Sequence, residues 1–178
     1  MTTDAILDEL LPAPAGGIVA GDDGSAHAYR ALETAFGLAD RLDRPLLVVR
    51  TWTIDTLPHG VLVDHGLVAS FDEVSDTIAA LEVARSEVLA SRHPEVVVTY
   101  RALSGQAGEV LTRLSRDASM IVVGSRGLGG VAGLLVGSVS SDCVRHAHCP
   151  VLVVPAEASA HGIPVTNGPV AALAGRVD

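Results

Sequence analysis

The sequence predicts an α/β protein, built as a doubly wound open sheet of five parallel strands with helices on both faces. Hydrophobic residues make up 48% of the 178 residues but aromatic residues only 3%, so the core must be aliphatic. The runs of Val, Ile and Leu are continuous, as expected of strands that are buried on both faces of a parallel sheet. Segments with strand and helix character also alternate along the chain, which is the order of βαβ units.

Five strands and four helices are expected from these segments. The strands are expected at 17–21, 45–51, 95–102, 118–123 and 150–154. The first helix should follow Ser25, a favourable N-cap residue, and the others are expected at 71–91, 105–116 and 138–146. Ser138 is expected to cap the last helix. The segment 52–70 is irregular, and a loop of this length is either mobile or functional.

The helix expected at 71–91 is interpreted as amphipathic. Its charged residues are assigned to a solvated face. Its apolar face is assigned to Val74, Ile78, Leu81, Val83, Ala84 and Val88.

Length and charge limit the organisation and the partners. A chain of 178 residues suits one domain, expected at 16–155, with a mobile leader at 1–15 and a disordered tail at 156–178. The net charge of −9 and the pI near 5.1 argue against nucleic acid and anionic membranes as partners. No apolar run is long enough to span a bilayer, and two cysteines without a signal peptide favour a reduced, cytoplasmic setting.

A glycine-rich stretch between the fourth strand and the last helix is the main candidate for a binding site. The strand runs into Gly124, and Gly137 and Ser138 open the helix. Amides in the first turn of a helix lack intrahelical partners and carry partial positive charge, so they bind phosphate oxygens readily. Glycines allow close approach of the backbone, while Ser138 can add a hydroxyl and Arg126 a positive charge. The stretch therefore predicts a phosphate-binding loop.

Two other glycine motifs compete for the same residues. A P-loop requires a lysine, which this loop lacks, so that interpretation fails. Residues 127–132 match the G-x-G-x-x-A dinucleotide fingerprint, but they follow the fourth strand instead of the first, and no acidic residue ends the later strand. Such a short glycine pattern is a weak signal.

The full spacing Gly124-x2-Gly127-x9-Gly137-Ser138 matches the G-x2-G-x9-G-[ST] signature of ATP-binding universal stress proteins, and the chain resembles that family. Residues 21–25 (Gly-Asp-Asp-Gly-Ser) are similar to its first-strand turn, and 122–127 and 149–154 to its fourth and fifth strand signatures. The resemblance covers roughly 16–155. It implies a Rossmann-like fold, of the adenine nucleotide alpha hydrolase type, that binds ATP with Mg²⁺ at the carboxyl ends of the strands.

The resemblance also implies roles for single residues. Asp23, close to Gly21, would lie beside the ribose, and the backbone around Thr51 would meet the adenine edge. The triphosphate would be cradled by Gly124, Gly127, Gly137, Ser138 and Val139, with Ser125, Arg126 and Gly130 alongside.

Two further implications concern charge and assembly. Asp22 stands where the family usually has an apolar residue, and it would weaken triphosphate binding unless it points away or helps to hold Mg²⁺. Many family members are homodimers that pair through the fifth strand, here Val151 to Val154.

The function expected is that of a nucleotide-dependent regulatory or stress-response module, with no catalytic residue assigned. The alternatives are a slow Mg²⁺-dependent ATPase, for which only Asp22 and Asp23 are near enough to act as a base, and a cyclic AMP-binding regulator. No G-x-S-x-G elbow is present. Cysteine and histidine residues near the last helix are interpreted as structural, not as zinc ligands, and two histidines in the long loop as solvated. These residues are Cys143, His146, His148 and Cys149, and His59 and His65.

Overall fold

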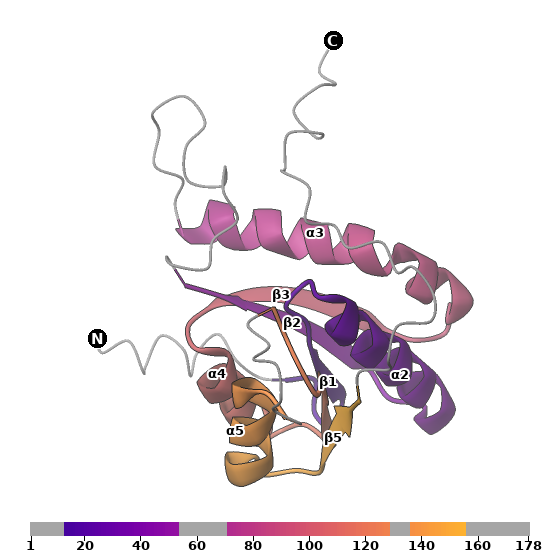
Figure 1. The fold of residues 1–178 in the computed structure, drawn as a ribbon. Coiled ribbons are helices and arrows are strands. Elements are labelled where there is room, and N and C mark those ends of the chain that lie inside the picture. The colour runs from indigo at the N-terminus through magenta and orange to yellow at the C-terminus, as the bar shows by residue number, and fades with distance from the viewer. Residues whose placement is uncertain (1–12, 54–70, 129–135, 156–178) are drawn as a thin grey trace, which may run out of the picture.

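The structure is a computed structural model that describes residues 13–53, 71–128 and 136–155. Its five parallel strands form one sheet in the order β3-β2-β1-β4-β5 (Figure 1). The strands are β1 (Ile18–Gly21), β2 (Leu46–Trp52), β3 (Val98–Ser104), β4 (Met120–Gly124) and β5 (Val151–Val154). The helices are α2 (Ala26–Leu42), α3 (Phe71–Arg92), α4 (Ala107–Leu114) and α5 (Ser138–His146). The predicted doubly wound α/β fold is confirmed.

The helices form a layer on each face of the sheet, α2 and α3 on one face and α4 and α5 on the other (Figure 1). Successive side chains of a strand point to opposite faces. Accordingly, Val48 packs in the cluster that contains Phe36 of α2, and Val49 packs in the cluster that contains Leu111 and Leu114 of α4. Both faces of the central strands are therefore buried, as their continuous aliphatic runs predict.

The chain order of the sheet reverses between β1 and β4. From β1 the chain winds outward to β2 and β3, and it then returns to place β4 on the other side of β1 and β5 beyond it. In open α/β sheets, the connections leave the carboxyl ends of the two strands in opposite directions at such a point, and ligands bind in the resulting crevice. The topology thus places the turn after β1 and the loop after β4 side by side.

The element boundaries agree with the sequence prediction to within two residues except at the start of the third strand. The third strand was expected to begin at residue 95, but β3 begins at Val98, because the chain turns there with Val96 N–H donating to His93 O. The strand continues to Ser104, which pairs with Trp52 at the end of β2. The N-cap of α5 is Gly137 and not Ser138, which is the first residue of the helix.

The expected inward face of α3 is partly wrong. The buried residues of α3 are Val74, Ile78, Glu82, Ser86 and Leu89. Val83 and Val88, which were assigned to the apolar face, are about half exposed, with 48% and 54% of their surface accessible. Glu82, which was assigned to the solvated face, is completely buried. The side that faces the sheet carries polar groups because they find partners there: Ser86 Oγ donates to Tyr100 Oη of β3.

The segment just before β1 packs against the domain. Ala13 is buried in the α4 and α5 layer, Gly17 N–H donates to Pro14 O, and Gly16 N–H donates to Asp117 O. Ala13 and Pro14 therefore contact the rest of the described domain, although they fall within the leader expected at 1–15. Residues 1–12, the tail at 156–178 and the loop at 54–70, with His59 and His65, lie outside the described residues.

Candidate functional site

A cavity of about 610 Å³ opens at the carboxyl edge of the sheet, where the chain order reverses. Its walls come from the β1–α2 turn, the end of β2, the start of α4 and the β4–α5 loop with the first turn of α5. A cavity of this size is in the range of small-molecule sites. The cavity therefore lies where the topology and the glycine-rich loop both predict a ligand site.

The β1–α2 turn is fixed by its own side chains. Gly24 N–H donates to Asp22 Oδ1 at 2.9 Å, and Ser25 N–H donates to Asp23 Oδ1 at 3.0 Å. Ser25 Oγ then accepts from Ala28 N–H at 3.1 Å and caps α2, as predicted. Gly24 has a φ of +84°, which favours glycine, and a Cβ there would lie 3.1 Å from the Arg50 guanidinium nitrogens. These hydrogen bonds hold the backbone of the turn that carries Asp23.

Asp23 joins this turn to the glycine-rich loop. Its Oδ2 accepts a hydrogen bond of 2.8 Å from the backbone N–H of Leu128, 105 positions later in the chain. Gly127 lies so close to the Asp23 carboxylate that a Cβ at position 127 would collide with Oδ2. Residue 127 is therefore glycine because of this contact between the turn and the loop.

The two ends of the glycine-rich loop are tied together by one carbonyl group. Ser125 O accepts from Gly137 N–H at 2.7 Å and from Ser140 Oγ at 3.5 Å. Ser125 N–H donates to Val154 O of β5. The first turn of α5 is held in this way against the end of β4, with its amides at the cavity wall formed by Ser138 and Val139.

The cavity continues past the end of β2. Thr51 and Trp52 line it there, and Trp52 Nε1–H donates to Ser75 Oγ of α3 at 3.1 Å. Trp52 is 4% exposed, packs against Phe71 and is the only tryptophan in the sequence. It therefore provides an intrinsic fluorescence probe inside the cavity wall.

Four charged side chains form a cluster that begins in the cavity wall, with Asp22 and Arg50, and continues behind it; sequence reasoning missed this cluster apart from Asp22. Asp22 Oδ2 accepts from Arg85 Nε at 2.8 Å, and Glu82 Oε1 accepts from Arg50 Nη1 at 2.8 Å. Arg85 also donates to Ser25 O and lies over the Tyr29 ring. The Asp22 carboxylate is thus paired with Arg85, although Asp22 also lines the cavity.

Burial and the neighbouring Asp22 raise the pKa of Glu82 to about 8, although Arg50 acts in the opposite direction. The side chain of Glu82 is only 1% exposed, and desolvation disfavours its charged form. A signal for this cluster does exist in the sequence, since Val74, Ile78, Glu82 and Ser86 recur every four residues. Residue type alone placed Glu82 on the wrong face.

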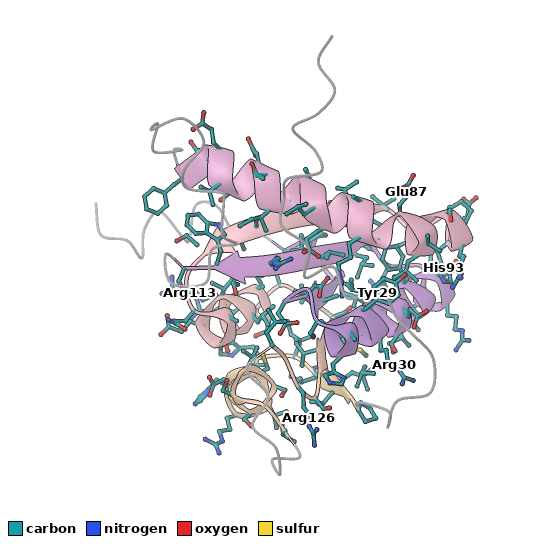
Figure 2. The ribbon with its side chains drawn as sticks, turned by 45° about the horizontal axis from the view of Figure 1, so that its top comes forward. Tyr29, Arg30, Glu87, His93, Arg113 and Arg126 are labelled. Atoms are coloured by element: carbon teal, nitrogen blue, oxygen red, sulfur yellow. The ribbon has the colours of Figure 1, made fainter. Side chains whose placement is uncertain are left out.

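The structure brings most of the predicted site residues to one cavity. Nine of them line it: Gly21, Asp23, Thr51, Gly124, Arg126, Gly127, Gly137, Ser138 and Val139. Ser125 is buried and lies behind the wall, where its backbone organises the loop. Gly130 lies outside the described residues. Figure 2 shows the Arg126 side chain at the end of the molecule near α5, remote from α3.

Metal-binding and membrane-spanning features were also considered for the described residues. In 13–53, 71–128 and 136–155, no group of three or more His, Cys, Asp or Glu side chains could hold a metal ion. Cys143 is completely buried in the core, and burial raises the pKa of its thiol to about 11. Within the same ranges, no helix is both long and apolar enough to cross a membrane.

The comparison with known proteins agrees with the fold. The model of the universal stress protein family matches residues 16–155. The chain belongs to the universal stress protein family. A universal stress protein of Mycobacterium tuberculosis (strain CDC 1551) is 38% identical over 159 residues, which cover 79% of this chain and 48% of the relative. The chain thus spans about half the length of the curated relatives it matches.

Solved structures of this family share the fold. The universal stress protein UspA from Lactobacillus plantarum superposes with a TM-score of 0.62 at 18% identity, covering 80% of this chain and 99% of its own. A universal stress protein in complex with cAMP gives a TM-score of 0.58 at 21% identity, covering 80% and 98%. One from Archaeoglobus fulgidus in complex with dAMP gives 0.54 at 20% identity, covering 80% and 99%. Likeness at this level of identity concerns the fold alone.

Proposed function

We propose that this protein is a nucleotide-dependent regulatory module of the stress response that binds ATP, with Mg²⁺, in the cavity at the carboxyl edge of the sheet. The observation that carries the proposal is the contact between Asp23 and the β4–α5 loop. This contact brings a carboxylate, which can accept hydrogen bonds from ribose hydroxyls, next to a glycine-rich loop and a helix N-terminus. The N–H groups of that loop and helix can donate hydrogen bonds to phosphate. Both ends of a nucleoside phosphate thus meet groups of suitable chemistry.

The arrangement of the cavity suggests a pose for the nucleotide. The phosphates would lie against Gly124, Gly127 and the first turn of α5, where amide groups and Ser138 supply donors. The adenine would lie at the end of β2 against the backbone of Thr51. Mg²⁺ would neutralise part of the triphosphate charge and would be held mainly by the phosphates, since the Asp22 carboxylate is already paired with Arg85.

Regulatory binding is favoured over hydrolysis by the two carboxylates in the cavity wall. A hydrolase needs a base that is free to orient the attacking water. Asp22 is 4% exposed and bonded to Arg85, and Asp23, which accepts two backbone N–H groups, is assigned to the ribose in this pose. A slow ATPase thus has no well-placed base among the described residues of the wall.

A cyclic AMP-binding regulator is the second candidate, supported by the related structure in complex with cAMP. A cyclic monophosphate carries one phosphate charge and would use the Gly137 to Val139 end less fully than ATP does. Mass spectrometry of ligand released from the purified protein, followed by calorimetric titration of the stripped protein with ATP, ADP and cyclic AMP, distinguishes the two. Co-purified ATP or tight Mg²⁺-dependent ATP binding supports the proposal, whereas preference for cyclic AMP supports the second candidate. Absence of binding to all three rejects both.

The role of Asp23 has a separate test. We expect the wild-type protein to bind ATP more tightly than 2′-deoxy- and 3′-deoxy-ATP, by roughly tenfold for whichever hydroxyl meets the carboxylate. Asp23→Ala should weaken ATP binding and remove that preference. Without the carboxylate the ribose hydroxyl has no acceptor at this position, so removal of the hydroxyl no longer weakens binding. If the preference persists in folded Asp23→Ala, Asp23 does not contact the ribose.

We further propose that the chain forms a homodimer through β5. Val151 to Val154 form an edge strand of four aliphatic residues, paired only with β4 among the described strands. Exposed apolar edges commonly pair with another strand. A monomeric mass by light scattering at micromolar concentrations would reject this dimer.

The free thiols of Cys143 and Cys149 suit the reduced cytoplasmic setting in which ATP is available.

A further inference from the structure

The wall of the cavity next to α3 contains a cation that the nucleotide signature does not include. Arg50 lies on β2 beside Thr51, and its side chain, 21% exposed, lines the cavity. Its guanidinium lies against Gly24 in the β1–α2 turn and donates to Glu82 Oε1 of α3 at 2.8 Å. Arg50 is thus shared between the cavity and a buried carboxyl group.

Glu82 is held incompletely. Its Oε1 accepts from Arg50, but Oε2 has no hydrogen-bond partner among the described residues, and the side chain is 1% exposed. An unpartnered oxygen on a buried carboxylate is costly, and protonation of the group is the simplest way to relieve that cost.

The charged and titratable groups around Glu82 come from β2, the β1–α2 turn, α2, α3 and β3. Arg50 comes from β2 and Asp22 from the β1–α2 turn, where Asp22 is paired with Arg85 of α3. Polar neighbours one step further away are Tyr29 of α2, which lies under Arg85, and Tyr100 of β3, which accepts from Ser86. With Glu82 protonated, the two arginines and Asp22 leave one positive charge beside the cavity. With Glu82 ionised, the four charges cancel.

We propose that Arg50 is an anion-binding residue of the nucleotide cavity and that Glu82 is its positioning residue, which takes up a proton when the nucleotide binds. This inference rests on the proposed nucleotide binding. Ionised Glu82 holds Arg50 toward α3, whereas protonated Glu82 leaves the guanidinium charge available to the ligand.

Two physical effects give the linkage the same sign. The negative charge of the nucleotide disfavours a second negative charge nearby, and movement of Arg50 toward the nucleotide removes the cation that stabilises ionised Glu82. Both favour protonated Glu82 in the complex. The pKa of Glu82 in the free protein, about 8, brings this titration into an accessible range. ATP affinity should therefore fall as the pH rises above about 8, by at most about tenfold per pH unit.

The test is calorimetric titration with ATP at pH 8.5 in two buffers of different ionisation enthalpy, which counts the protons taken up on binding. We expect the wild-type protein to take up a fraction of a proton more than Glu82→Gln does when ATP binds. Protons exchanged by ATP itself are the same in both titrations, so they cancel in this comparison. Glu82→Gln should also keep nearly constant affinity from pH 7.5 to 9.5. The matched control is Glu87→Gln, which removes one carboxylate from the exposed side of α3 (Figure 2) and should behave like the wild type.

The outcomes separate this inference from the proposed function. Equal proton uptake by the wild type and Glu82→Gln, with ATP bound by both, overturns the inference and leaves the proposed function standing. Failure of every variant to bind ATP overturns both. Arg50→Gln gives an independent readout that does not require Glu82→Gln to fold: it should weaken ATP binding and abolish the pH dependence, and an unchanged pH profile would contradict the linkage.

Discussion

Substitution of Gly137 by Asp should weaken ATP binding without disturbing the fold. Gly137 has a φ of −76° and a ψ of 170°, which any residue adopts, and it is the N-cap of α5 without a side-chain cap bond. A Cβ there would lie 3.5 Å from Ser125 O and 3.7 Å from Arg126 Cα, which are ordinary contacts. Asp is among the best N-cap residues and should stabilise α5 by a few tenths of a kcal/mol relative to Gly. We therefore expect Gly137→Asp to fold.

The same carboxylate would lie where the proposed pose places phosphate. Two unit charges about 4 Å apart repel by about 1 kcal/mol in bulk water and by about 4 kcal/mol at the effective dielectric constant near a protein surface. These limits correspond to roughly fivefold and roughly thousandfold weaker ATP binding. The upper part of this range is expected, because a triphosphate carries more than one charge near the helix end.

The assay is calorimetric titration with ATP, supported by Trp52 fluorescence as a check on the cavity wall. Gly137→Asn is the matched control, since it has nearly the same shape and capping ability but no charge. Asn should weaken binding less than Asp, and the difference between the two should shrink at high salt. Wild-type ATP affinity in folded Gly137→Asp would refute the placement of phosphate at α5.

Three further predictions concern stability. Ser25→Ala should cost about 1 kcal/mol in urea unfolding through loss of the Ala28 cap, and an unchanged unfolding midpoint would show that the cap contributes nothing. Arg85→Ala should cost about 3–5 kcal/mol, because Asp22 is left buried without its partner; a loss below about 1 kcal/mol would mean that Asp22 is well solvated. The pKa of Glu82 is about 8 in the folded protein against an ordinary 4.5, so the folded state binds more protons between these values. Stability should thus fall from about pH 4.5 to 8, by up to about 1.4 kcal/mol per pH unit, and Glu82→Gln should unfold with a flatter pH profile.

The sequence predicted the sheet and the position of the cavity because both depend on strong local signals. The aliphatic runs of β1, β2 and β4 are buried on both faces, and their ends carry turn residues such as Gly24 and Ser25. Parallel strands bring their carboxyl ends to one edge, so the turn after β1 and the loop after β4 had to meet. The contact between Asp23 and Leu128, however, joins positions 105 residues apart, and only the folded chain shows it.

The prediction failed for α3 because residue type is a poor guide to burial in a helix with apolar residues on all sides. Val83 and Val88 are exposed, while Glu82 is buried with Arg50 as its partner. A buried carboxyl group is tolerated when a cation or a proton compensates its charge, and the partner lies 32 residues earlier on β2. Periodicity of the helix alone does not contain that information.

The departure of Asp22 from the usual apolar residue is compensated by the cluster around it. Asp22 raises the pKa of Glu82, so the carboxylate gained at position 22 is offset by the proton that Glu82 retains. With Glu82 protonated, the cluster keeps one net positive charge beside the cavity that we propose binds an anionic nucleotide, in a protein of net charge −9. Asp22→Asn should accordingly lower the pH above which ATP affinity falls, because the Asp22 charge no longer favours the protonated form of Glu82. Calorimetric titration with ATP across pH 6.5 to 9.5 measures that pH in both proteins. If it does not move in folded Asp22→Asn, Asp22 does not influence the protonation of Glu82 and the compensation is absent.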